Sequence, residues 1–261
     1  MCRKLSLGFA ILLGTQVAIA EKSPWSGDGE LGITHTSGNT TNENTIAKLK
    51  IGYTQSSWEH EAKLEVLRTS DDDKLTAERY GLDFESDYKL SDVSYLFGKF
   101  RYEDDSFSGY KYQASLIGGY GYKLFETDIT SLKLKAGIGV RLSELETTSE
   151  SDASEADDQE GIIGFGLSES DTSGADDDQE GIIGFGLNYS RKIGAHSEFT
   201  QDFLVEAGSE NIYSESDTGL KVSITEKLAL KLSLSIKSNS DAPADKEKTD
   251  TVSAVTLVYS F

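Results

Sequence analysis

Charged side chains of both signs recur at every second position along several segments of the chain. In one of these segments Glu61, Lys63 and Glu65 alternate with the apolar Ala62 and Leu64. Because successive side chains of a strand point to opposite faces of a sheet, such charges share one face. Inside a closed sheet they would either pair with one another or line a path for ions and small polar solutes. We predict an inward set that consists of Lys48, Lys50, Glu61, Lys63, Glu65, Arg79, Asp83, Glu85, Lys133, Lys135, Arg141, Asp202, Glu206, Lys221 and Lys231.

Both uses of this inward set remain open at the level of the sequence. Opposite charges on adjacent strands can pair and fill a narrow interior, and small barrels tend to fill with side chains. Glycines on the same face would instead free space for a pore. The glycines expected on that face are Gly52, Gly81, Gly119, Gly121, Gly137 and Gly139.

A His-x-Ser pair at His35 and Ser37 has the residue types for nucleophilic catalysis, with histidine as the base and serine as the nucleophile. Lipid-hydrolysing outer-membrane barrels use such a pair on a strand. Nearby asparagines give only weak support for a third group that orients His35, and the sequence Ser37-Gly38-Asn39 is typical of a turn. We therefore expect no catalytic residues and no enzyme, and keep a lipid-modifying hydrolase as the alternative.

Acidic residues are concentrated in one segment. Residues 144–180 contain fourteen Asp and Glu and no Lys or Arg. The segment lacks the ligand spacing of an EF-hand loop, so it predicts diffuse attraction of divalent cations rather than a specific calcium site. His60 and His196 stand apart from other ligand residues, and the sequence indicates no metal site and no cofactor.

The first twenty residues are typical of an export signal. Arg3 and Lys4 precede an apolar run, and Ala18-Ile19-Ala20 has the small-x-small form of a cleavage site, which predicts a signal peptide over 1–20. The single cysteine, Cys2, lies in this segment, so residues 21–261 can form no disulfide. No later apolar run reaches the length of a membrane helix, and any membrane crossing must use strands. The formal net charge of −20 argues against nucleic acid as a partner.

Segments with a period of two, separated by turn residues, predict twelve strands. The connections after even-numbered strands are short, and those after odd-numbered strands are longer and polar. Outer-membrane barrels have this asymmetry, with short periplasmic turns, long extracellular loops and an even number of strands. The sequence therefore predicts an all-β fold over 21–261, an antiparallel up-and-down transmembrane barrel in contact with outer-membrane lipid and lipopolysaccharide. The strands are expected near 25–35, 44–54, 58–68, 78–89, 94–104, 110–124, 130–143, 180–191, 197–207, 215–225, 228–237 and 249–261.

The last expected strand places Val255, Leu257, Tyr259 and Phe261 on one face. A terminal aromatic residue preceded by alternating apolar residues resembles the signal that the barrel-assembly machinery of Gram-negative bacteria reads. We predict that Tyr259 and Phe261 form this assembly signal.

A tandem repeat lies in the longest connection, with 149–167 recurring as 168–187. One extra spanning strand would break the up-and-down parity, so only one copy of Gly-Ile-Ile-Gly-Phe-Gly-Leu should span the membrane. We assign the spanning role to 181–187, because Asn188-Tyr189-Ser190-Arg191 continues it toward a turn. The duplicated acidic segment, 144–180, is expected to form an extracellular loop.

The segment 25–40, with its Trp-x-Gly and Ser-Gly-Asn-Thr elements, resembles the YdiY-like family of salt-induced outer-membrane proteins. Tyr102-Glu-Asp-Asp-Ser-Phe and 118–122 match as well, and the similarity covers nearly the whole of 21–261, although the acidic duplication departs from it. The resemblance implies an outer-membrane location and induction by salt, and it supplies no catalytic residues. The expected function is non-enzymatic, in envelope adaptation to salt or in narrow passage of ions and small solutes. A structural or adhesive surface protein is a further alternative.

Overall fold

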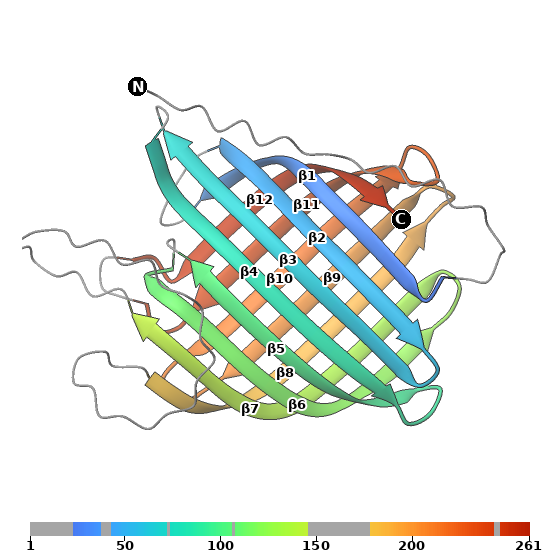
Figure 1. The fold of residues 1–261 in the computed structure, drawn as a ribbon, viewed down its shortest axis with the longest axis horizontal. Coiled ribbons are helices and arrows are strands. Elements are labelled where there is room, and N and C mark those ends of the chain that lie inside the picture. Colours follow the sequence, from blue (N-terminus) through green and yellow to red (C-terminus); the bar gives the residue numbers. More distant parts are fainter. Residues whose placement is uncertain (1–22, 38–42, 72–73, 106–107, 146–177, 243–245) are drawn as a thin grey trace, which may run out of the picture.

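The computed structural model describes residues 23–37, 43–71, 74–105, 108–145, 178–242 and 246–261. These residues form one closed antiparallel barrel in which each strand pairs with the next along the chain and the first pairs with the last (Figure 1). The up-and-down barrel of twelve strands predicted from the sequence is confirmed. The strands are β1 (Trp25–Ser37), β2 (Glu43–Gln55), β3 (Trp58–Asp71), β4 (Lys74–Lys89), β5 (Ser94–Asp105), β6 (Tyr110–Glu126), β7 (Thr130–Leu145), β8 (Asp178–Ile193), β9 (Ser197–Ala207), β10 (Ile212–Ser223), β11 (Leu228–Asn239) and β12 (Thr249–Ser260).

The predicted acidic loop is narrower than 144–180. Strand β7 continues to Leu145 and β8 begins at Asp178, so Glu144 is a strand residue. Glu180, the first residue of the strand expected near 180–191, lies within β8. Both side chains pair with basic residues of the wall, Glu144 with Lys111 at 2.9 Å and Glu180 with Arg141 at 3.1 Å. The sequence argument considered only 144–180, which contains no Lys or Arg, and so missed these partners. Residues 146–177, with the first repeat copy, lie outside the described residues. The second copy, 181–187, lies in β8 as predicted.

The barrel has two unlike ends, which we name the turn end and the loop end. The turn end holds the short connections after even-numbered strands, together with Trp25 and Phe261. In the turn between β8 and β9, Gly194 has a φ of 79°, a left-handed conformation that favours glycine. The loop end holds the connections after odd-numbered strands. This arrangement follows from an even number of strands with both chain ends on one side.

Apolar side chains cover the outside of the barrel. Leu31, Ile33, Ile138 and Ile183 are each more than 60% exposed, on β1, β7 and β8. Aliphatic side chains exposed to this degree around a closed sheet would be unfavourable in water but suit a hydrocarbon environment. The outer face is therefore a lipid-facing band.

Neighbouring side chains occupy the space beside several inward glycines. A Cβ at Gly121 would lie 2.1 Å from Cζ of Tyr95, and one at Gly184 would lie 2.8 Å from Cδ1 of Ile117. Tyr95 and Ile117 are buried, together with Phe97 and Ile182. Glycine has no side chain, and on this part of the wall the space that it leaves is taken by large neighbouring side chains rather than by a pore.

Candidate functional site

The strand register brings the predicted inward charges onto one face. Lys48 of β2 lies opposite Glu65 of β3, and Lys63 of β3 lies opposite Asp83 of β4. Directly opposed residues point to the same side of a sheet, so the face continues from strand to strand. Lys135 of β7 reaches across to Glu85 of β4, at 2.5 Å, although β5 and β6 separate these strands. Such a contact can only run through the interior.

Half-exposed ion pairs occupy one part of this inward face. Nζ of Lys50 lies 2.6 Å from Glu61, which is also 3.2 Å from Nζ of Lys63. The exposed fractions of these side chains are 47% for Lys50, 37% for Glu61 and 43% for Lys63. Water therefore reaches this part of the interior, which we name the wet chamber.

The other predicted inward residues have partners of the same kind. Lys48 pairs with Glu65 at 2.5 Å, and Lys231 of β11 pairs with Glu30 of β1 at 2.8 Å. Asp202 accepts a hydrogen bond of 2.6 Å from the amide of Asn188. The remaining pairs are Asp83 with Lys99 and Lys221 with Glu198, and Lys133 is partly exposed.

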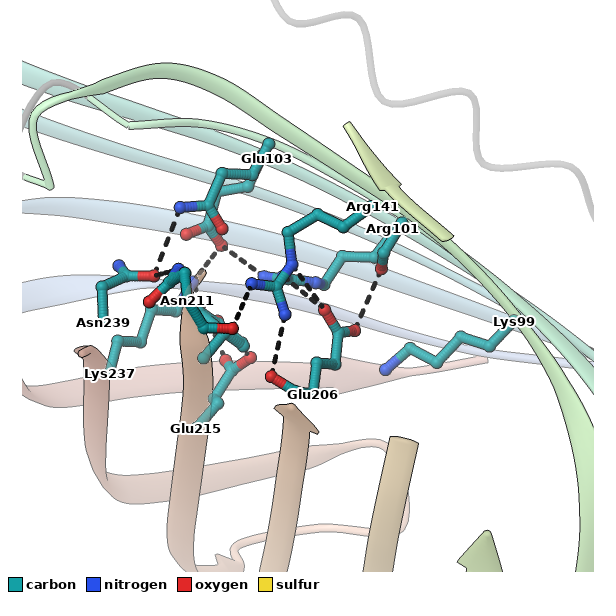
Figure 2. Close-up of polar contacts among 12 residues, drawn as sticks. Lys99, Arg101, Glu103, Arg141, Glu206, Asn211, Glu215, Lys237 and Asn239 are labelled. Atoms are coloured by element: carbon teal, nitrogen blue, oxygen red, sulfur yellow. Dashed lines mark hydrogen bonds and ion pairs between the residues drawn. The ribbon is translucent and has the colours of Figure 1, made fainter. Parts of the chain in front are cut away.

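A second group of polar side chains crosses the barrel near the loop end and is almost completely buried (Figure 2). We name it the loop-end layer. Arg141 and Glu206 are 0% exposed, and no other member exceeds 9%. The layer consists of Arg101 and Glu103 of β5, Gln113 and Ser115 of β6, Arg141 of β7, Glu180 of β8, Glu206 of β9, Tyr213 of β10, Lys237 and Asn239 of β11, and Asn211 before β10.

Glu206 is the centre of the loop-end layer. Nη2 of Arg101 donates to Oε2 of Glu206 at 3.0 Å, and the hydroxyl of Ser115 donates to Oε1 at 3.0 Å. The guanidinium of Arg101 also lies 3.8 Å from the ring centre of Tyr213, within cation–π range. Strands β6, β7 and β8 separate β5 from β9, so this ion pair joins separate parts of the wall through the interior.

Arg141 holds the connection between β9 and β10. Its Nη1 donates to the carbonyl of Asn211 at 3.0 Å and to Glu180 at 3.1 Å, and its Nη2 donates to the carbonyl of Glu206 at 2.8 Å. The carboxylate of Glu180 accepts in turn from the backbone N–H of Glu210 at 3.0 Å. The Arg141–Glu180 pair thus binds both ends of this connection to β7 and β8.

Amide side chains extend the layer to β11. The side-chain oxygen Oδ1 of Asn239 accepts from Nδ2 of Asn211 at 2.8 Å and from Nε2 of Gln113 at 3.2 Å. These bonds join β6 and β11 to the residue before β10. The hydroxyl of Tyr110 donates to the carbonyl of Asp241 at 2.5 Å, from the start of β6 to the connection after β11. These bonds tie two connections to the opposite wall.

Ion pairs complete the layer beside the amides. Lys237 pairs with Glu103 across the interior and lies 3.8 Å from Glu215. Nε of Arg79 donates to Asp105 at 2.7 Å. Removing one partner from buried pairs of this kind leaves an uncompensated charge, which is strongly unfavourable.

An apolar cluster closes the remaining side of the loop end. Ile46, Leu67, Val252 and Ala254 of β2, β3 and β12 pack together and are at most 6% exposed. The loop end is therefore filled by polar contacts on one side and by apolar packing on the other. The half-exposed charges of the wet chamber lie outside this filled part of the interior.

The predicted set contained Arg141 and Glu206 but omitted most of their partners. The same period of two that predicted the other inward charges is present at Lys99, Arg101, Glu103 and Asp105. Arg101 and Glu103 could therefore have been predicted as inward residues. Which side chains meet across the barrel could not be read from a period, because it depends on strand tilt and closure.

The alternative hydrolase pair lies in β1. His35 is opposite Ser253 and Ser37 is opposite Thr251 in the backbone register, and the side chains of the pair lie outside the described residues. Within the described ranges, no group of three His, Cys, Asp or Glu side chains is arranged to hold a metal ion. His60 lies instead among aromatic rings of the turn end, with its ring centre 5.6 Å from that of Trp58 and 6.2 Å from that of Phe84.

A closed antiparallel barrel with an apolar exterior and a charged interior defines an outer-membrane β-barrel. The chain belongs to DUF481, a family of proteins of unknown function, which matches residues 29–261. The predicted resemblance to YdiY-like proteins is confirmed. The chain is 27% identical over 246 residues to the uncharacterized protein YdiY of Escherichia coli (strain K12), covering 92% of this chain and 84% of that protein.

Solved structures share the fold at low sequence identity. The NanC porin superposes with a TM-score of 0.52 at 10% identity, covering 88% of this chain and 98% of the porin. The translocator domain of the autotransporter NalP from Neisseria meningitidis superposes with a TM-score of 0.50 at 10% identity, covering 93% of this chain and 90% of that domain. These likenesses show a common barrel architecture.

Proposed function

We propose that this protein is a non-enzymatic channel for ions or small polar solutes, which the loop-end layer closes in the state described here. The observation that carries the proposal is the contrast in exposure along one inward face. Lys50 and Lys63 of the wet chamber are more than 40% exposed, whereas Arg141 and Glu206 are fully buried. A barrel filled by a permanent plug has no need for a hydrated, charged chamber behind it.

The loop-end layer is made of contacts that can be broken and remade. Its cross-barrel links are ion pairs and hydrogen bonds between side chains, and they leave the strands of the wall paired. Among the described residues, Nε and Nη1 of Arg101 and Nε of Arg141 have no hydrogen-bond partner. Buried donors of this kind are usually satisfied by water, so the layer is suited to hydration.

Conductance in planar bilayers tests the proposal. Wild-type protein should show rare or small openings. The double variant Arg101→Ala/Glu206→Ala removes both charges of the central pair and should conduct steadily and more strongly. The matched control, Glu30→Ala/Lys231→Ala, removes a pair outside the loop-end layer and should behave like wild type. If neither wild type nor the Arg101/Glu206 double variant conducts above a protein-free bilayer, the channel proposal is wrong.

The orientation and the wider role belong to the same proposal. We place the loop end outside the cell and the turn end in the periplasm, as in other outer-membrane barrels. Residues 1–20 would direct export, the barrel-assembly machinery would insert the chain, and the acidic segment would attract divalent cations beside lipopolysaccharide. A role in adaptation to salt fits the half-exposed ion pairs of the wet chamber, because dissolved salt screens them.

A further inference from the structure

A group of uncharged polar side chains lies on the lipid-facing side of β9 and β10. We name Gln201, Ser214, Ser216 and Thr218 the polar island. Gln201 lies opposite Thr218, and Ser216 lies opposite Phe203, which is 38% exposed on the outer face. Directly opposed residues share a face, so the polar island faces the membrane.

Gln201, Ser216 and Thr218 lie inside the apolar band, whereas Ser214 lies opposite Ser238, toward the loop end. On β10, Ile212 precedes the island with 48% exposure, and Val222 follows it with 41%. On β11, Leu234 and Ile236 lie opposite Thr218 and Ser216 and are 38% and 37% exposed. Lipid-facing apolar side chains of β11 therefore lie beside Ser216 and Thr218, and apolar residues lie before and after the polar island along β10.

Hydrogen bonds hold part of the polar island flat against the sheet. The hydroxyl of Thr218 donates to Oε1 of Gln201 at 2.7 Å, and Nε2 of Gln201 donates to Oγ of Ser216 at 3.0 Å. Over the part of the chain that the structure describes, no acceptor is seen for the hydroxyl protons of Ser214 and Ser216. Acyl chains offer no acceptor either, so another protein surface is a more favourable neighbour than lipid.

The wall that carries the polar island is also the shortest part of the barrel. Strands β9 to β12 have 11 or 12 residues each, whereas β4, β6, β7 and β8 have 16 or 17. A tilted strand needs about 9–11 residues to cross the hydrocarbon core. The short wall therefore ends close to the membrane boundaries, and a second barrel can approach it over its full height.

We infer that the polar island is a contact surface for a second copy of this chain, related by a two-fold axis along the membrane normal. Serine, threonine and glutamine each donate and accept hydrogen bonds, and the island carries no charge, so it is complementary to itself. A two-fold interface brings the same patch of both copies together. The inference is independent of the proposed channel, because it concerns the outer face and not the interior.

Single-cysteine crosslinking tests this inference in isolated outer membranes. The one native cysteine, Cys2, is replaced by serine, and Ser216→Cys is compared with Ile138→Cys. Ile138 is 74% exposed on β7, which is outside the short wall and three strands from β10 around the barrel, and it is the matched control. Under mild oxidation Ser216→Cys should give a product of twice the monomer mass, and Ile138→Cys only the monomer. Equal dimer yields at both positions, a monomer at both, or a product of another mass would overturn the inference.

A second variant removes the polar island without adding bulk. Gln201→Leu, Ser216→Ala and Thr218→Val are combined with Ile236→Cys as the reporter, and Ile236→Cys alone is the reference. The triple variant should still migrate faster unboiled than boiled, which reports a closed barrel, and should lose the crosslinked dimer. A folded triple variant that crosslinks as well as the reference would show that the island does not form the contact.

Discussion

The C-terminal residue, Phe261, is seated on Gly27 of β1. The backbone N–H of Gly27 donates to the carbonyl of Phe261 at 3.0 Å, and the N–H of Phe261 donates to the carbonyl of Gly27 at 2.9 Å. A Cβ at position 27 would lie 2.3 Å from Cζ of the Phe261 ring, so the ring fills the space that any larger residue would need. The last residue of the chain thus completes the seam that closes the barrel.

Replacing Gly27 should weaken this seam. Gly27→Val places two methyl groups where the Phe261 ring lies, so the ring, which is 59% exposed at the end of the chain, must turn aside. The loss should be at or below the low end of the about 1–3 kcal/mol that overpacking costs in a core. The midpoint of urea unfolding in lipid vesicles should fall relative to wild type. Gly29→Val is the matched control, because nothing lies within 4 Å of a Cβ at Gly29 on the same strand. Adding Phe261→Ala to Gly27→Val should recover part of the loss. Equal midpoints for the two glycine variants would contradict the prediction.

Deleting Phe261 should affect assembly more than the finished barrel. The ring is 59% exposed, and full burial of a phenylalanine contributes only about 1.5–3 kcal/mol. The deletion also removes two backbone hydrogen bonds to Gly27, each worth about 0.5–1.5 kcal/mol, at one end of a seam that otherwise stays paired, so the loss of stability should be modest. If Tyr259 and Phe261 form the predicted assembly signal, cells should nevertheless insert far less of the shortened chain into the outer membrane. Immunoblots of outer-membrane fractions measure this, and purified chains refolded in detergent provide the comparison. Normal outer-membrane levels would count against the signal.

The sequence predicted the barrel because its information is local. The alternation of Leu228, Leu230 and Leu232 with smaller or charged residues requires a strand with one apolar face, and the same test repeats along the chain. The Arg101–Glu206 pair could not be predicted in this way. Its residues are separated by 105 positions, and they meet only because the sheet closes with one particular tilt. Local patterns therefore gave the wall and the inward charges, and closure decided which of those charges seal the loop end.

Removing Arg141 should be far more costly than removing a charge of the wet chamber. Arg141→Met leaves the carboxylate of Glu180 and the carbonyls of Glu206 and Asn211 without their buried donor, and breaking a buried pair costs about 3–5 kcal/mol. Lys63→Met removes a half-exposed partner of Glu61, worth about 0–1 kcal/mol. Urea unfolding in lipid vesicles measures both. Similar losses of unfolding free energy for the two variants would show that burial does not determine how much a charged side chain of the interior contributes to stability.

Either copy of the tandem repeat should be sufficient for strand β8. Residues 158–167 and 178–187 have the same sequence, Asp-Gln-Glu-Gly-Ile-Ile-Gly-Phe-Gly-Leu, and deletion of 149–167 or of 168–187 leaves one of them joined to Asn188. Each shortened chain keeps a glutamate at the place of Glu180, which pairs with Arg141 at 3.1 Å. Both chains should therefore close into barrels that migrate faster unboiled than boiled.

Deletion of 149–187 is the control for this prediction, because it removes both copies. It takes away ten of the residues that β8 pairs with β7, from Asp178 to Leu187, and the barrel should fail to close. Loss of folding on deletion of 149–167 alone would show that the first copy is needed as well, so that the two copies are not equivalent. Folding of the chain without either copy would show that residues outside the repeat can replace β8. We do not expect this, because the other segments with a period of two already form the remaining strands of the barrel.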